Sequence, residues 1–469
     1  MTRLSFVIVT GALGLLPIVA GASATLHVPA GYATIQAAID AANEGDVISV
    51  APGTYQEEID FHGKNIMVRA AQGPAVTHLR GDDDGIVVSF VSGESSAAVL
   101  DGFTISHGYG GYGGAVQCDG ASPLIRGNVI ECNGSVYKGS GIAMLNGSHA
   151  CIEHNCIRGN YAEWKGAAIS SNDSEPIIKN NLIIDNYSEY QGGALYGRNS
   201  LFTLQNNTIA ANHSGSRGGA GLFGIDCGLV AANNIIADNT GGPDSGQGIY
   251  LEGTVSTYET ACNDFWNNQG GPCGGEAIPG ATDLNVDPRF APGPNGNHYL
   301  KHDAAGNPLS PCVDAGSCTS ADLELDEYCT RFDLLPDAGI IDLGFHYPQP
   351  EHLDSTWLMV VLNQEQYYPD DPFTMIALLN NPGTALDGTV AVVLQAMDTY
   401  FFWPDWTETV FLPAIALPPA ARFGAELLSF QWPTGVGTGE MIIWSALFNG
   451  DPLTDNLLSI HDHSFTYTD

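Results

Sequence analysis

Basic residues are scarce in this sequence of 469 residues, which has 15 Lys and Arg against 52 Asp and Glu and a formal net charge of −37. A nucleic acid or an anionic membrane surface would repel such a chain, so we exclude both as partners. Only 14% of the residues are charged while 44% are hydrophobic. This composition excludes a disordered acidic chain and predicts a folded protein.

Long hydrophobic runs and paired metal-binding cysteines are also missing. No stretch after residue 24 is long enough to span a bilayer. The ten cysteines lie between Cys118 and Cys329 and include no Cys-x-x-Cys pair, which argues against zinc. Their number permits up to five disulfides in an oxidising compartment, and close spacings such as Cys262/Cys273 favour local bridges.

Residues 1–24 have the pattern of an export signal. Arg3 supplies a positive charge, residues 4–19 an apolar core, and Ala22-Ser23-Ala24 a small-residue cleavage site. A membrane anchor is the alternative, but glycines and a proline interrupt the apolar run, which is also shorter than a bilayer span. We therefore expect a chain that is exported and works outside the cell or on its surface.

A repeat of 26–29 residues runs through the middle of the chain, marked by an Asn-x-x-x-x-Asn pair. The first asparagines are Asn128, Asn155, Asn181, Asn207, Asn234 and Asn263, and the second are Asn133, Asn160, Asn186, Asn212, Asn239 and Asn268. A unit this short cannot bury its own apolar face and must stack on its neighbours, which predicts a parallel β-helix. Both asparagine columns are interpreted as structural ladders, because stacked amides bond to one another and Asn tolerates left-handed turns.

The N-terminal end of the coil is expected to be covered by a short helix. Thr34 is a suitable N-cap, and Ile35, Ala38, Ile39 and Ala42 follow at helical spacing before a glycine. Such a helix would shield the open edge of the first turn from aggregation.

Several segments resemble a known family. Residues 32–40 and 45–57 resemble the N-terminal part of pectin-lyase-like, right-handed parallel β-helix proteins. The Gly-Gly-Ala and Asn-Asn-x-Ile patterns are similar to the repeats of secreted bacterial β-helix proteins, and residues 287–316 resemble their closing segment. The resemblance spans roughly residues 26–347 and implies a right-handed coil of roughly ten turns. It implies fold more strongly than activity, because the scaffold hosts lyases, hydrolases, esterases and adhesins.

The composition changes after Tyr347, where Cys and Lys are absent and five tryptophans cluster. Short apolar runs between turn residues predict a β-sandwich here, with the tryptophans in its core. The expected organisation is all-β: a signal peptide at 1–24, a right-handed parallel β-helix with a short N-terminal capping helix at 25–348, and a β-sandwich module at 349–469.

An aromatic groove is expected between each second asparagine and the next small-residue corner. Two columns of rings and the charged residues beside them would form it: Tyr137, Trp164 and Tyr190; Tyr161, Tyr187 and His213; and Lys138, Lys165, Arg217, Glu163 and Glu189. Rings stack on sugars while charged groups fix hydroxyls or carboxylates, so the pattern predicts a polysaccharide track. A row of loops that packs on itself stays open as the structural alternative. Arg126, Glu153 and Lys179 are interpreted as a salt ladder between turns.

Three functions remain open. We favour a monomeric protein that binds a polysaccharide or cell-surface glycan. The first alternative is a Ca²⁺-dependent polyuronate lyase of the pectate-lyase type, with Lys138 or Lys165 as catalytic base, so the sequence leaves open whether the chain is an enzyme. A non-catalytic surface spacer is the third. Two acidic groups are candidate Ca²⁺ ligands, with solvated acidic turns as the alternative: Asp82, Asp83 and Asp84, and Asp322 and Asp326.

Overall fold

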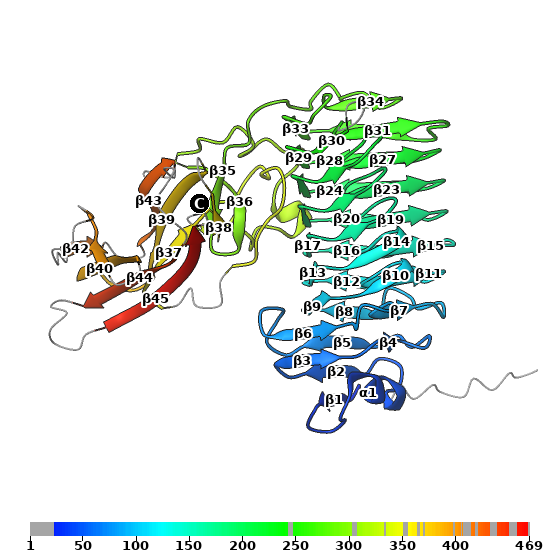
Figure 1. Cartoon of the computed structure of the whole chain (residues 1–469), viewed down its shortest axis with the longest axis horizontal. Coiled ribbons are helices and arrows are strands. Elements are labelled where there is room, and N and C mark those ends of the chain that lie inside the picture. The colour runs from blue at the N-terminus through cyan, green and yellow to red at the C-terminus, as the bar shows by residue number, and fades with distance from the viewer. Residues whose placement is uncertain are drawn as a thin grey trace, which may run out of the picture.

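The repeats form a parallel β-helix in the computed structural model (Figure 1). The structure describes residues 23–242, 247–302, 307–332, 334–349, 355–363, 366–368, 371–396, 399–404, 406, 414–417, 421–431, 439–449 and 457–467. Residues 1–22 of the predicted signal peptide lie outside the described residues.

Four parallel sheets make up the coil, and each strand pairs with the strands one turn before and after it. Sheet A contains β1 (Thr25–Val28), β2 (Val47–Val50), β5 (Met67–Ala70), β8 (Val99–Asp101), β12 (Leu124–Arg126), β16 (Cys151–Glu153), β20 (Ile177–Lys179), β24 (Leu201–Gln205), β28 (Gly228–Ala232) and β32 (Tyr258–Ala261). Sheet B contains β3 (Gly53–Gln56), β6 (Thr77–Arg80), β9 (Thr104–Ser106), β13 (Val129–Glu131), β17 (Cys156–Arg158), β21 (Leu182–Ile184), β25 (Thr208–Ala210), β29 (Ile235–Ala237) and β33 (Asp264–Trp266). The number of stacked strands confirms the expected coil of about ten turns.

The other two sheets complete each turn. Sheet C contains β4 (Ile59–Asp60), β7 (Val88–Phe90), β11 (Val116–Asp119), β15 (Ile142–Leu145), β19 (Ile169–Asn172), β23 (Leu195–Arg198), β27 (Leu222–Ile225), β31 (Ile249–Glu252) and β34 (Cys273–Gly275). Sheet D contains β10 (Tyr109–Tyr112), β14 (Gly134–Lys138), β18 (Tyr161–Ala162), β22 (Tyr187–Ser188), β26 (His213–Ser214) and β30 (Thr240–Gly241). Within one turn the chain passes through sheets C, A, B and D in that order, and sheet D is confined to six turns.

The interior of the coil is filled by apolar columns between two asparagine ladders. Ile152 pairs in register with Ile125 and Ile178, and all three side chains are fully buried. In the first ladder, Asn155 Nδ2 donates to Asn181 Oδ1 at 3.0 Å, and the Asn155 backbone N–H donates to the same oxygen at 3.0 Å. The second ladder repeats this pattern from Asn133 to Asn268. Both columns are therefore confirmed as structural ladders.

The left-handed backbone lies one residue earlier than the sequence analysis expected. The ladder asparagines do not have positive φ angles; the residues before them do, as Asn180 (φ 48°) and Asn206 (φ 53°) show. Because the backbone turns at this preceding residue, the side chain of the asparagine that follows can point inward along the stack.

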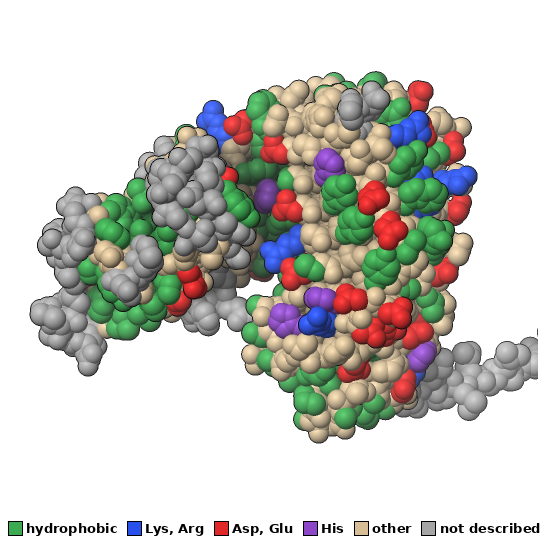
Figure 2. All heavy atoms as spheres, viewed as in Figure 1, with side chains coloured by type: hydrophobic (Ala, Val, Ile, Leu, Met, Phe, Trp, Pro, Cys, Tyr) green, Lys and Arg blue, Asp and Glu red, His purple; other side chains and the backbone are tan. Residues whose placement is uncertain are grey.

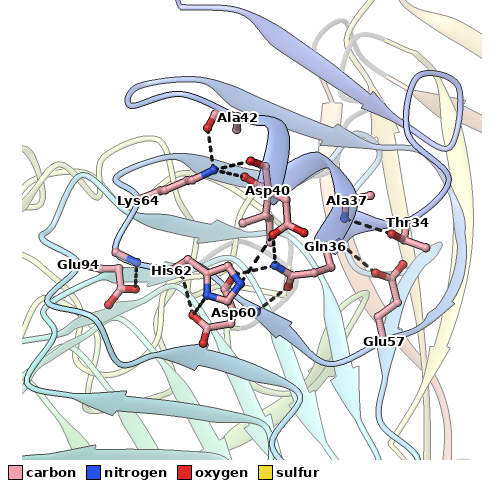
Figure 3. A network of polar contacts seen from close by, with 12 residues as sticks. Thr34, Gln36, Ala37, Asp40, Ala42, Glu57, Asp60, His62, Lys64 and Glu94 are labelled. Atoms are coloured by element: carbon pink, nitrogen blue, oxygen red, sulfur yellow. Dashed lines mark hydrogen bonds and ion pairs between the residues drawn. The ribbon is translucent and has the colours of Figure 1, made fainter.

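The first turn is covered by helix α1 (Ile35–Ala41), as expected. Thr34 Oγ1 accepts from the Ala37 backbone N–H at 3.1 Å, and the Glu57 carboxylate accepts from two further N–H groups of the first helical turn (Figure 3). At the other end, Lys64 Nζ donates to the carbonyl oxygens of Asp40 and Ala42 at 2.8 and 2.9 Å. Side chains from the next turn therefore satisfy both ends of a helix only seven residues long.

After the last turn the chain returns along the side of the coil. Hairpin β35 (Phe290–Gly293) and β36 (Gly296–Leu300) and the 3-10 helix η1 (Ala321–Leu323) belong to this segment. Asn180 Nδ2 donates to the His346 carbonyl at 2.9 Å, and the His346 N–H donates to Asn180 Oδ1 at 2.7 Å. The closing segment therefore docks on the side of the coil near its middle.

Two sheets follow the coil and share one hydrophobic core. The smaller consists of β37 (Trp357–Leu362), β39 (Pro372–Asn381) and β43 (Ala421–Gln431). The larger consists of β38 (Gln366–Tyr367), β45 (Leu457–Tyr467), β44 (Gly439–Asn449), β40 (Leu386–Ala396) and β41 (Thr399–Phe402), with β42 (Ala414–Leu417) beside β40. Strand pairing is antiparallel except between β38 and β45. These sheets are consistent with a separate β module.

Some tryptophans of this region contribute to the core. Trp357 is buried, and Trp403 and Trp406 are partly buried against the shared core. Trp432 lies outside the described residues. Trp357 packs in the cluster that joins the coil, and Trp444 is partly exposed and lies outside the shared core. The interpretation as core residues of the module therefore fits Trp403 and Trp406.

The expected disulfides are not found, since none of the ten cysteines is in a disulfide. Cys262 follows the sheet A strand β32, whereas Cys273 begins the sheet C strand β34, so their short spacing in sequence separates them across the coil. Across the described ranges, the structure contains no helix with the length and apolar character of a membrane span.

Candidate functional site

Sheet D carries one of the two predicted ring columns, which we call the self-packed stack: Tyr161, Tyr187 and His213. Strands β18, β22 and β26 are in register, so these side chains lie directly over one another. Ring centroids are 5.8 and 5.0 Å apart, and successive planes deviate by only 9° and 7°. Neighbouring rings therefore cover one another's faces, as in the structural alternative of a row that packs on itself.

The second column has a different geometry. We call it the aromatic row: Tyr112, Tyr137, Trp164 and Tyr190. The Tyr137 and Trp164 ring centroids are 6.5 Å apart with their planes at 61°, and the Trp164 and Tyr190 centroids are also 6.5 Å apart. Trp164 is 50% exposed. The Tyr137–Trp164 contact is wide and edge-on, whereas Trp164 and Tyr190 are stacked at 27°. Both columns leave ring surface exposed, and the exposed fraction is largest at Trp164.

Tyr112 was missed in the sequence because it is out of phase with the other rings. Tyr137 and Trp164 stand two residues before the corner glycine, whereas Tyr112 stands one residue before Gly113. A register shift between Gly110 and Tyr112 in the β10–β14 pair absorbs this difference. The Tyr112 ring then comes within 5.4 Å of the Tyr137 ring, so the bulge extends the row by one turn.

The two predicted glutamates are held by tyrosine hydroxyl groups. Tyr109 OH donates to Glu163 Oε1 at 2.5 Å, and Tyr161 OH donates to Glu189. The bond to Glu189 raises the pKa of Tyr161 to about 12. Tyr109, which the sequence analysis did not include, reaches across two turns to make its contact. These bonds orient both carboxylates beside the rings while leaving acceptor capacity for sugar hydroxyls.

The two predicted catalytic lysines meet on the outer side of sheet C. Lys138 and Lys165 pair across one turn, and each Nζ lies 4.8 Å from the centroid of the Tyr196 ring. Lys138 Nζ also donates to Asn172 Oδ1 at 2.8 Å. Burial, with Lys165 and Arg198 nearby, lowers the pKa of Lys138 to about 8. Burial and Arg198 also lower the pKa of Lys165.

The lysines adjoin the aromatic row. Lys165 Nζ lies 5.2 Å from the Trp164 ring and 5.6 Å from the Tyr190 ring. Arg217 lies farther along, 3.8 Å from Glu252, and keeps half of its side chain exposed. Figure 2 shows hydrophobic and acidic side chains together on the face of the coil toward the viewer. The predicted bases therefore meet the aromatic row at Lys165.

The two acidic groups do not form a recognisable metal centre. Across the described ranges, no set of three or more His, Cys, Asp or Glu side chains has the arrangement of a metal site. The Asp82 carboxylate accepts from the Asp84 backbone N–H at 3.2 Å, and Asp322 accepts from the Thr319 hydroxyl at 2.6 Å. Asp83 and Asp326 complete the two predicted groups, for which Ca²⁺ binding stays a prediction.

A cleft of about 1610 Å³ lies on the other flank of the coil, between sheets A and B and the C-terminal sheets (Figure 2). Its coil wall carries paired charges: Arg126 with Asp101 at 3.1 Å, Arg158 with Glu131 at 2.8 Å, and Lys179 with Glu153 at 2.8 Å. The predicted salt ladder is therefore present between Glu153 and Lys179, but Arg126 pairs with Asp101 instead.

The cleft was not predicted, because it depends on where the C-terminal segment docks. His154 stacks on Tyr328 of that segment, with ring centroids 4.7 Å apart. Burial lowers the pKa of His154 to about 4, so this histidine is neutral at physiological pH. With its basic groups paired and its histidine neutral, this wall offers less free charge than the aromatic face.

Comparisons with known proteins support the fold. Residues 78–222 match the family model described as the right handed beta helix region. No curated protein sequence matches the chain. The enzymatically active domain of tailspike protein 2 of bacteriophage CBA120 aligns over 92% of this chain and 73% of that chain, at 8% identity and a TM-score of 0.23. A TM-score this low carries no argument, so the right-handed parallel β-helix is identified by the family match and the strand pairing alone.

Proposed function

We propose that this chain is an exported protein that binds a polysaccharide along the aromatic row. The observation that carries the proposal is the half-exposed Trp164, the most exposed ring of the row, which meets Tyr137 edge-on at 6.5 Å. Exposed aromatic rings in a row are costly in water and suit sugar rings, whose C–H faces are apolar. The fixed carboxylates of Glu163 and Glu189 would accept hydrogen bonds from sugar hydroxyls. If the glycan belongs to a cell surface, the same contact makes the protein adhesive.

Retention on a panel of immobilised polysaccharides tests the proposal. We expect Trp164→Ala to weaken retention on the preferred polymer at least about tenfold, the effect of losing a central aromatic contact. Ile177→Ala is the control, because Ile177 is an exposed apolar side chain on sheet A. Equal retention of the wild type and the Trp164 variant would show that the row is not the binding surface. No retention of the wild type on any polymer would favour a structural spacer.

A polyuronate lyase is the second candidate, favoured by the position and acidity of Lys138. An amine with a pKa of about 8 is neutral in part at physiological pH and can accept a proton from the carbon beside a uronate carboxylate. β-Elimination would then break the glycosidic C–O bond and leave an unsaturated product. Ultraviolet absorbance of that product, measured on pectate and alginate with Ca²⁺ and with a chelator, tests this candidate. No increase on either polymer would exclude these substrates.

Export and a monomeric state are part of the proposal. A signal peptide at residues 1–24 predicts a mature N-terminus at Thr25, which mass spectrometry of the protein from the culture medium would identify. Light scattering of the mature chain would give its molar mass. A protein found only inside the cell, or one with an intact N-terminus, would contradict the export signal.

A further inference from the structure

Three basic side chains converge beside the aromatic row, which we call the cation cluster: Lys138, Lys165 and Arg198. Lys138 and Lys165 lie on adjacent turns, and Arg198 pairs in register with Asn172, the residue that accepts from Lys138 Nζ. Such convergence is unusual in a chain with only 15 Lys and Arg and a net charge of −37. Random placement among 52 acidic residues would favour ion pairs instead.

The cluster has no carboxylate partner. Among the described residues, no Asp or Glu oxygen lies within 4.0 Å of the charged nitrogens of Lys138, Lys165 or Arg198. On the opposite flank, Lys179 and Arg158 each contact a glutamate at 2.8 Å. The Tyr196 ring and the more distant carboxylates of Asp173 and Glu252 offset the mutual repulsion of the cluster in part, and an anion that approaches would offset it further.

The polar groups around the cluster include both donors and acceptors. Because Asn172 Oδ1 accepts from Lys138, its Nδ2 is left as a donor, and this atom has no hydrogen-bond partner. Tyr196 OH accepts from Lys165 Nζ at 3.5 Å, which leaves its own proton free to be donated. An oxyanion can accept from the charged groups of the cluster and from this hydroxyl group, and bonds to charged donors are the stronger ones.

The cluster lies within one sugar unit of the aromatic row. Lys165 Nζ is 5.2 Å from the Trp164 ring, so a sugar stacked on this indole would place a ring substituent near the ammonium group. We propose that Lys138, Lys165 and Arg198 form an anion-binding pocket for the carboxylate or sulfate of a sugar held on Trp164, so that the ligand is an acidic polysaccharide. This inference rests on the proposed function and names the class of its ligand.

Matched polymers and paired variants test the pocket. The variant Lys138→Gln/Lys165→Gln is compared with Lys179→Gln, whose ammonium group is already paired with Glu153. The probes are polygalacturonate and its methyl ester for carboxylates, and dextran sulfate and dextran for sulfates. We expect the double variant to lose at least tenfold in affinity for one acidic polymer and to be unchanged on its neutral counterpart. Lys179→Gln should stay within twofold of the wild type.

The outcomes separate the two proposals. Equal losses on acidic and neutral polymers, or equal losses in the double variant and in Lys179→Gln, would overturn the pocket. If Trp164→Ala weakens binding and the double variant does not, the proposed function stands and the pocket is wrong. The preferred polymer pair distinguishes a carboxylate ligand from a sulfate ligand.

A second measurement tests the pocket without any polysaccharide. Inorganic sulfate should protect Lys138 and Lys165 from acetylation more than it protects Lys64, whose ammonium group is bound to backbone carbonyl groups. Mass spectrometry of the acetylated chain gives the extent of modification at each lysine. Selective protection supports the pocket even if every glycan tested fails to bind, whereas no protection at up to molar sulfate refutes it.

Discussion

The buried ladders and the exposed rows of this coil share one period but differ in extent. The first asparagine ladder runs without interruption from Asn128 to Asn263, while the aromatic row spans four turns, from Tyr112 to Tyr190. Every turn must satisfy its corner N–H groups, so selection for folding acts equally on all of them. No such requirement acts outside, where a short row indicates a local role. Continuity therefore marks the ladders as structural, whereas a short outer column can have either role, as the self-packed stack and the aromatic row illustrate.

The largest effect is expected inside the coil. Asn181→Ala removes the acceptor for the backbone N–H and the amide of Asn155, which are buried. Leaving such donors unpaired should lower the free energy of unfolding by about 2–5 kcal/mol, measured with urea. The control Gln205→Ala removes an amide from the outer face of sheet A and should change stability by less than about 1 kcal/mol. Similar losses of stability in both variants would show that the buried ladder amide contributes no more than an amide on the outer face.

The second prediction separates the two outer columns. Tyr187→Ala removes the central ring of the self-packed stack and its contacts with Tyr161 and His213. We expect a stability loss of about 1–2 kcal/mol from two ring contacts, with polysaccharide retention within about threefold of the wild type. Trp164→Ala should show the reverse, a loss of retention with little change in stability. A larger loss of retention in the Tyr187 variant than in the Trp164 variant would indicate that the ligand binds to the self-packed stack.

The third prediction concerns pH. The folded-state pKa of Lys138 is about 8, below the value of about 10.4 in an unfolded chain, so the unfolded chain binds more protons between these two values. Stability should therefore rise as pH increases from about 8 to about 10.4, by about 1 kcal/mol or less, because the side chain is only half-buried. Lys165 and Arg198 oppose the charge of Lys138 and Asp173 favours it. Lys138→Met should flatten the rise seen in urea titrations; an unchanged slope would contradict the lowered pKa.

The smallest effect is expected in the cleft. Glu153→Gln breaks the ion pair with Lys179, whose side chain is 44% exposed. Exposed pairs contribute little, so the free energy of unfolding should fall by about 0.2–1 kcal/mol and polysaccharide retention should not change. A marked loss of retention would mean that the cleft, and not the aromatic row, holds the glycan.

Features set by the repeat were predictable from the sequence. A period of 26–29 residues forces equivalent positions to stack, so both asparagine ladders and the apolar columns follow from arithmetic on the sequence. The capping helix followed from Thr34 and the helical spacing after it. The predicted position of the left-handed corners was wrong by one residue, because the asparagines were expected to adopt the left-handed turn in addition to forming the ladder.

Contacts between side chains on different turns could not be predicted from the sequence. Tyr196 and Arg198 look like ordinary strand residues in the sequence, and only the fold brings them to lysines that stand 31–60 positions earlier. The cleft depends on contacts such as that between Asn180 and His346, which are 166 positions apart. No local pattern encodes such a separation. The structure brings the predicted rings and lysines together, and their role in binding stays a prediction.

The docking of the closing segment at Asn180 has a mechanical consequence. Leu182 and Ile184 of β21 share a hydrophobic cluster with Phe345, Tyr347 and Trp357, so the C-terminal sheets are fastened at mid-height (Figure 1). Tension applied between the N-terminal end and these sheets would enter the coil at β21 and at the next turns, where the closing segment also bonds to Asn206, Thr208 and Asn233. The turns below β21, which hold Trp164, Lys138 and Lys165, would all lie in the path of the force.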